Sequence, residues 1–138
     1  MDKLAIYDTT LRDGNQGIGI GLSLSDKLLI AEKLSDFGVQ YIEGGWPNPT
    51  NEIDQAFYTQ IKKRKIKSKI AAFGSTRRPG VSLAEDTFLK LLVETGAPVA
   101  TIFGKSWDLH VEQVIRCSFS ENLDMIAESI AYLKKHMD

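Results

Sequence analysis

The sequence predicts an α/β fold built on a parallel sheet. Strand-like and helix-like segments alternate four times along the 138 residues, and no linker or low-complexity tract separates them. Apolar strand positions recur at intervals of about thirty to thirty-six residues, which is the length of one βα unit. These positions are Ile6, Ile42, Ile70 and Ile102. Short strands that alternate with amphipathic helices form parallel sheets through right-handed crossovers.

The first two βα units occupy the first half of the chain. A strand at Leu4–Tyr7 precedes a helix that begins near Ser23, where Ser23 and Asp26 have capping-box spacing, and Gly38 ends this helix. Its apolar face comprises Leu28, Ala31, Leu34 and Phe37. The second strand is Val39–Glu43, and the second helix begins at about Thr50. The apolar residues of that helix are Ile53, Phe57 and Ile61.

The last two units follow the same pattern. A strand at Lys69–Phe73 precedes a helix with capping-box spacing at Ser82 and Glu85. That helix contains Phe88, Leu91 and Leu92 and stops at Gly96. The fourth strand is Val99–Phe103, and after a long loop the last helix is capped at Ser120. Its apolar stripe comprises Leu123, Ile126, Ile130 and Leu133.

Composition excludes several classes of function. A net charge of -1 argues against a nucleic-acid surface, and we expect the basic run Lys62–Lys65 to be a solvated helix end. No apolar run is long enough to span a bilayer, so we expect no membrane partner. The single cysteine, Cys117, cannot form an intrachain disulfide. Together with an N-terminus that lacks a secretory signal, this predicts a cytoplasmic protein.

The turn after the first strand carries the strongest chemical signal. Arg12 stands beside Asp13, which places a fixed cation next to a hard oxygen ligand. Such a pair suits the joint binding of a divalent ion and an anionic oxygen, although an ordinary surface ion pair has the same sequence.

The wider string D-T-T-L-R-D-G-N-Q-G, residues 8–17, resembles the signature of the acetyl-CoA-dependent 2-oxoacid condensing enzymes. This family comprises the 2-isopropylmalate, homocitrate and citramalate synthases, and the 3-hydroxy-3-methylglutaryl-CoA (HMG-CoA) lyases share its superfamily. Three later strings most resemble the citramalate synthase branch: Ile42–Pro47, Ala72–Gly80 and Ile102–Val111. The resemblance covers essentially the whole chain.

The alternation of strands and helices is compatible with two architectures, a small doubly wound sheet and part of a (β/α)8 barrel. The family resemblance favours the barrel. It implies a partial TIM barrel of four βα units, because a complete barrel needs about 250 residues. We therefore expect residues 1–138 to form a single domain, the N-terminal half of a catalytic barrel. The partner would be the C-terminal half or a second copy of the chain.

The resemblance also implies roles for individual residues. Arg12 and Glu43 would be catalytic, Arg12 by stabilising an oxyanion and Glu43 by supporting the metal shell, and Asp13 would bind Mg²⁺ or Mn²⁺. The substrates would be acetyl-CoA and a 2-oxoacid, most simply pyruvate. Substrate-binding candidates are Gln16, Arg77, Ser106 and His110. Asp8 either orients Arg12 or holds the turn.

One family feature is missing. The resemblance implies a His-x-His metal pair, but the two histidines of the chain, His110 and His136, are far apart in sequence. We therefore expect an incomplete metal site and an inactive fragment. Two alternatives remain open: a lyase that breaks the carbon–carbon bond on the same scaffold, and a non-catalytic half-barrel that self-associates through its strand edges.

Overall fold

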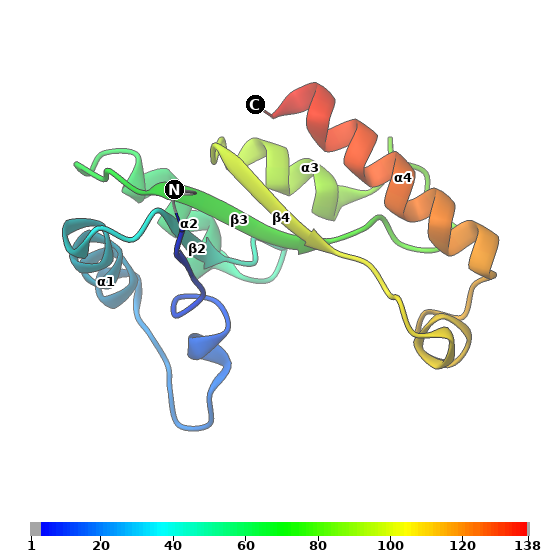
Figure 1. Ribbon diagram of the computed structural model, residues 1–138, viewed down its shortest axis with the longest axis horizontal. Coiled ribbons are helices and arrows are strands. Elements are labelled where there is room, and N and C mark those ends of the chain that lie inside the picture. Colours follow the sequence, from blue (N-terminus) through cyan, green and yellow to red (C-terminus); the bar gives the residue numbers. More distant parts are fainter. Residues whose placement is uncertain (1–3, 138) are drawn as a thin grey trace.

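A computed structural model describes residues 4–137 of the chain (Figure 1). In this range four strands alternate with four α-helices, and two shorter helical segments, one 3-10 and one π-helical, follow the first and fourth strands. The elements are β1 (Tyr7–Asp8), η1 (Gly14–Gln16), α1 (Leu24–Phe37), β2 (Tyr41–Gly45), α2 (Glu52–Ile61), β3 (Lys69–Ser75), α3 (Thr87–Glu94), β4 (Val99–Phe103), η2 (His110–Ile115) and α4 (Phe119–His136).

The strands form one parallel sheet in the order β1-β2-β3-β4, which confirms the predicted fold class. With right-handed crossovers, a sequential strand order puts every helix on the same face of the sheet. The sheet is curved in Figure 1, and its helices follow it from α1 to α4. This is the arrangement of consecutive units of a (β/α)8 barrel, since a doubly wound sheet reverses its strand order and carries helices on both faces. The architecture is a partial barrel.

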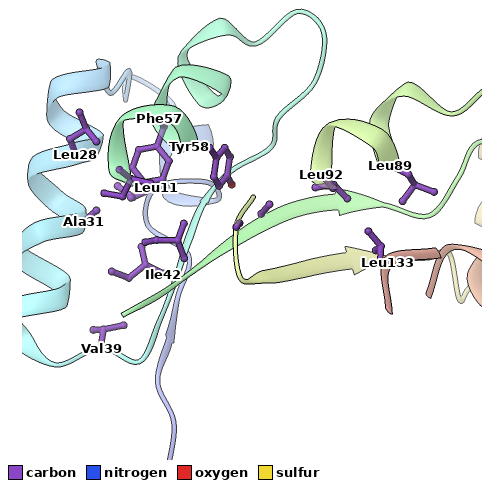
Figure 2. Packing of buried hydrophobic residues seen from close by; sticks show 14 residues of the cluster. Leu11, Leu28, Ala31, Val39, Ile42, Phe57, Tyr58, Leu89, Leu92 and Leu133 are labelled. Carbon is purple, nitrogen blue, oxygen red and sulfur yellow. The ribbon is translucent and has the colours of Figure 1, made fainter. Parts of the chain in front are cut away.

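Apolar side chains fill the space between the sheet and the helices. Leu28 and Ala31 of α1 and Phe57 of α2 pack on the side of β2 that carries Ile42 (Figure 2). Helix α3 approaches β3 so closely that a Cβ atom at Gly74 would lie 2.7 Å from Leu92 Cδ1. Glycine at this position therefore permits the contact between α3 and the sheet.

Helix α1 has the predicted ends. Ser23 and Asp26 form the complete capping box, and Gly38 adopts the left-handed conformation with φ of 97°. The run Lys62–Lys65 directly follows α2 and is exposed, as predicted. In residues 4–137 no helix is long and apolar enough to cross a membrane.

Two helix starts were predicted wrongly. Ser82 Oγ donates to Glu85 Oε2 at 2.7 Å, but this contact lies in a turn before α3. The helix starts at Thr87, because buried Asp86 accepts the backbone N–H groups of its first turn. Helix α4 is capped by Ser118 and not by Ser120, since Ser118 accepts from the N–H of Glu121.

Strand positions also differ from the prediction. Strand β1 is Tyr7–Asp8 and not Leu4–Tyr7; Asp8 pairs with Ile42, so Ile6 is not the counterpart of Ile42. Strand β2 lies two residues later than predicted, and β3 extends to Ser75, whereas β4 matches. Ile102 pairs with Gly74 and not with Ile70, because equal spacing in sequence does not fix the stagger between neighbouring strands.

Four residues assigned to apolar helix faces are exposed: Phe37, Ile53, Leu123 and Ile130. In α2 the buried face instead includes Asp54, and in α4 it includes Asn122 and Ser129. Each of these buried polar side chains has a hydrogen-bond partner, which a periodicity of apolar residues does not reveal. Asp54 accepts from Asn51 Nδ2, Asn122 donates to the carbonyl of Lys105, and Ser129 donates to the carbonyl of Met125.

Candidate active site

A tight turn after β1 fixes the backbone of Arg12. The N–H groups of Arg12, Asp13 and Gly14 all donate to the carbonyl of Thr9, at 3.2, 2.8 and 3.2 Å. Leu11 is fully buried in the same core cluster as Phe57 (Figure 2). The turn is therefore anchored on one side by the core, while Arg12 projects from the carboxyl-terminal edge of the sheet.

The guanidinium of Arg12 is held by three neighbours. Its Nε donates to Glu43 Oε1 in a charge-assisted hydrogen bond, and its Nη1 donates to Asp13 Oδ1 at 2.8 Å. Its Cζ atom lies 3.9 Å from the ring centroid of Phe73 on β3. Within residues 4–137, Nη2 makes no hydrogen bond, so this edge of the cation can meet an anionic oxygen.

Glu43 lies under Arg12 and is only 1% exposed. Its second oxygen, Oε2, accepts from the hydroxyl of Tyr7 at 2.8 Å. Both oxygens are therefore occupied by protein donors, and the carboxylate holds Arg12 in place. Burial and the neighbouring Glu43 raise the pKa of Tyr7 well above its ordinary value, although the hydrogen bond with Thr101 opposes the shift. Tyr7 therefore remains a hydrogen-bond donor.

Three aromatic side chains form a platform beside Arg12. The ring of Trp46 contacts Phe73 and Phe103 edge-on, with centroids 5.5 and 5.9 Å apart, and Phe73 stacks on Phe103 at 5.6 Å. Neither this platform nor Tyr7 was predicted from the sequence. Aromatic residues near the ends of three successive strands were the available signal, because parallel strands end at one edge of a sheet.

Asp13 and Asp8 occupy different environments in the turn. The side chain of Asp13 is 63% exposed at the rim, where its Oδ1 accepts from Arg12. Asp8 accepts from the N–H and the hydroxyl of Thr10, at 3.0 and 3.1 Å. Of the two roles left open for Asp8, these contacts are those of a residue that holds the turn.

The remaining candidate residues lie apart from this cluster. Arg77 points toward α4, where its Nε donates to Glu128 Oε2 at 2.6 Å. Ser106 is exposed after β4, and the ring of His110 packs against Trp107 with centroids 4.6 Å apart. Gln16 is exposed in η1. No hydrogen bond within residues 4–137 joins any of these four side chains to Arg12 or Glu43.

A divalent ion fits this site only in part. An exposed carboxylate beside Arg12 is the hard oxygen ligand that Mg²⁺ or Mn²⁺ prefers, and Asp13 supplies it. In the described range, residues 4–137, no three acidic, histidine or cysteine side chains converge as a metal-binding group. Within residues 4–137, Asp13 is the exposed carboxylate beside Arg12 that could act as a ligand.

Comparison with known proteins gives a consistent family. Residues 3–138 match the HMGL-like family model. The (R)-citramalate synthases of Aquifex aeolicus and Geobacter sulfurreducens are 52% and 49% identical over 99% of this chain, which spans 26% of each enzyme. The 2-isopropylmalate synthase of Saccharolobus solfataricus is 34% identical over 97% of the chain and 33% of that enzyme. The chain thus spans about a quarter to a third of these relatives.

Solved structures agree on the fold. An HMG-CoA lyase from Bacillus subtilis superposes with a TM-score of 0.73 at 22% sequence identity, over 96% of this chain and 43% of that protein. A hydroxymethylglutaryl-CoA lyase from Pseudomonas aeruginosa also gives a TM-score of 0.73, at 19% identity. At these sequence identities the structural similarity shows a shared fold alone.

Proposed function

The chain belongs to the HMGL-like family, and from this premise we propose that it is the N-terminal part of an acyltransferase that condenses acetyl-CoA with a 2-oxoacid. Pyruvate is the proposed acceptor, because the citramalate synthases are about half identical to the chain and the 2-isopropylmalate synthases only about a third. The product would be citramalate, and the proposed setting is cytoplasmic synthesis of isoleucine, or of leucine for the larger acceptor.

The observation that carries the proposal is the fixed guanidinium of Arg12 at the carboxyl-terminal edge of the sheet. Chemistry in βα barrels occurs at this edge. When the acetyl carbon attacks the carbonyl of the oxoacid, negative charge develops on the carbonyl oxygen. A cation already oriented by Glu43 and Phe73 stabilises that charge without reorganising during the reaction.

The other residues have supporting roles in this proposal. Asp13 would contribute one ligand to Mg²⁺ or Mn²⁺, which when bound polarises the oxoacid carbonyl as a Lewis acid. Glu43 is a positioning residue, since both its oxygens are engaged by protein donors. Gln16 in η1, Ser106 after β4 and His110 in η2 remain proposed substrate contacts. Arg77 is proposed to contact substrate only if it leaves Glu128. The remaining ligands and the base that deprotonates acetyl-CoA would come from the rest of the barrel.

A chimera tests the proposal directly. This chain would replace the matching residues of the Aquifex aeolicus (R)-citramalate synthase, to which it is 52% identical. With acetyl-CoA, pyruvate and Mn²⁺, we expect release of the CoA thiol. Arg12→Lys should lower kcat by about a hundredfold, because one ammonium nitrogen cannot take the places of both Nε and Nη1, which bond Glu43 and Asp13. Arg64→Lys is the matched control, since Arg64 pairs with Glu32 in an exposed position.

The outcomes separate the candidate functions. A folded chimera that releases no thiol, or an Arg12→Lys variant with full activity, would contradict the proposal. Preference for 3-methyl-2-oxobutanoate over pyruvate would indicate a 2-isopropylmalate synthase, and release of acetoacetate from HMG-CoA would indicate a lyase. Turnover by the 138-residue chain alone would contradict the proposal that the remaining ligands and the base come from elsewhere.

A further inference from the structure

Tyr7 connects two strands that are not neighbours in the sheet. Its hydroxyl lies 2.6 Å from Thr101 Oγ1 on β4 and 2.8 Å from Glu43 Oε2 on β2. Since β1 lies at one edge of the sheet and β4 at the other, the side chain must reach across the concave face. Its ring is stacked on Tyr41, with centroids 6.1 Å apart.

These contacts continue to the guanidinium. Glu43 receives Tyr7 on Oε2 and Arg12 on Oε1, so one buried carboxylate joins the hydroxyl to the cation. Within residues 4–137, the hydroxyl of Tyr7 is the hydrogen-bond donor to Oε2. Without the Tyr7 hydroxyl, Oε2 of Glu43 would be a buried carboxylate oxygen without a hydrogen-bond donor, because Glu43 is only 1% exposed. The carboxylate would then rotate toward another donor. That rotation would move the acceptor of Arg12 Nε.

We propose that Tyr7 is a positioning residue for Arg12, acting through Glu43, and that Thr101 fixes the Tyr7 hydroxyl from the opposite edge of the half-barrel. The catalytic consequence depends on the proposed function, whereas the effect on Arg12 itself does not. In this proposal the curvature that brings β4 toward β1 also sets the orientation of the cation. A loss of the hydroxyl would therefore lower the rate of the chemical step and not the affinity for acetyl-CoA.

Kinetics of the citramalate synthase chimera test the catalytic part. Tyr7→Phe keeps the ring on Tyr41 and removes the hydroxyl; we expect kcat to fall about tenfold, as for loss of one hydrogen bond to a charged group, with the KM for acetyl-CoA unchanged. In the Arg12→Lys variant, adding Tyr7→Phe should lower kcat little further, because the guanidinium that Tyr7 positions is already absent. Thr101→Val should give a smaller loss. An equal loss in both backgrounds, or an unchanged kcat, would overturn the proposal.

Hydrogen exchange tests positioning without any activity. In the 138-residue chain, the Nε–H of Arg12 can be followed by ¹⁵N NMR, and we expect Tyr7→Phe to speed its exchange about tenfold. Tyr41→Phe, which keeps the stacked ring, should leave the rate unchanged. Equal exchange in the unaltered and Tyr7→Phe chains would refute the positioning role. An inactive unaltered chimera with faster exchange in Tyr7→Phe would instead refute only the proposed function.

Discussion

Replacing Lys27 by Met should strongly destabilise the fold. Lys27 is fully buried in α1, and its ammonium donates to Asp54 Oδ1 on α2. The other oxygen of Asp54 accepts from the N–H of Trp46 at 2.8 Å and from Asn51 Nδ2 at 2.9 Å. The pair therefore holds α1, α2 and the segment after β2 together. Met has a similar length and leaves the charge of Asp54 buried without its cation.

The expected loss of unfolding free energy is large because Lys27 and Asp54 are both buried. Removing one partner of a buried ion pair costs about 3–5 kcal/mol. A chain of 138 residues gains about 0.3 kcal/mol/K of entropy on unfolding near its melting temperature, so the Tm should fall by about 10–17 °C. In the Lys27→Met/Asp54→Asn double variant, part of the loss should be recovered, because no unpaired charge remains.

Thermal unfolding followed by circular dichroism measures these changes. Arg64→Met is the matched control, because it removes a cation from the pair with Glu32, whose side chains are 47% and 31% exposed. We expect less than about 1 kcal/mol for the control. A Lys27→Met variant as stable as this control, or a double variant that is less stable than Lys27→Met alone, would refute the reasoning.

Three further changes test other parts of the molecule. Gly74→Ala places a Cβ 2.7 Å from Leu92 Cδ1 and should cost about 1–3 kcal/mol of unfolding free energy, while Gly21→Ala, with no atom within 4 Å, should be neutral in the same denaturation assay. Burial would raise the pKa of Asp86, but N–H donors from Arg78 and Leu89 and the Arg78 cation outweigh it, so the pKa lies below its ordinary value. The ionised carboxylate therefore stabilises the fold fully above the unfolded-state pKa of about 3.9, and this stabilisation is lost as the pH falls through the folded-state pKa. Asn caps a helix as well as Asp, so the unaltered chain should exceed Asp86→Asn in unfolding free energy at neutral pH and lose this excess below about pH 3.9. A difference in unfolding free energy that does not change with pH would contradict this. The exposed Ile130 lies beside an apolar cavity of about 290 Å³ with Ala100 and Ile102; we expect concentration-dependent self-association in sedimentation, reduced by Ile130→Glu, and a monomer at all concentrations would argue against it.

Much of the fold could be predicted because its signals are local. The capping box of Ser23 and Asp26 and the left-handed Gly38 act within a few residues of each other, so α1 was predicted with its ends. Strand β4 was likewise predicted at Val99–Phe103. The start of α3 was missed, because the helix begins after buried Asp86 and not at Ser82, and burial is not a local property.

The candidate site shows the same division. That Arg12 and Asp13 share a turn after the first strand could be established without coordinates, since adjacent residues in a turn remain close however the chain folds. The contacts of Glu43 with Arg12, of Tyr7 with Thr101 and of Arg77 with Glu128 on α4 depend instead on the folded sheet. These pairs are separated by 31 to 94 residues. Their contacts depend on the stagger and curvature of the whole sheet, which no short segment of sequence encodes.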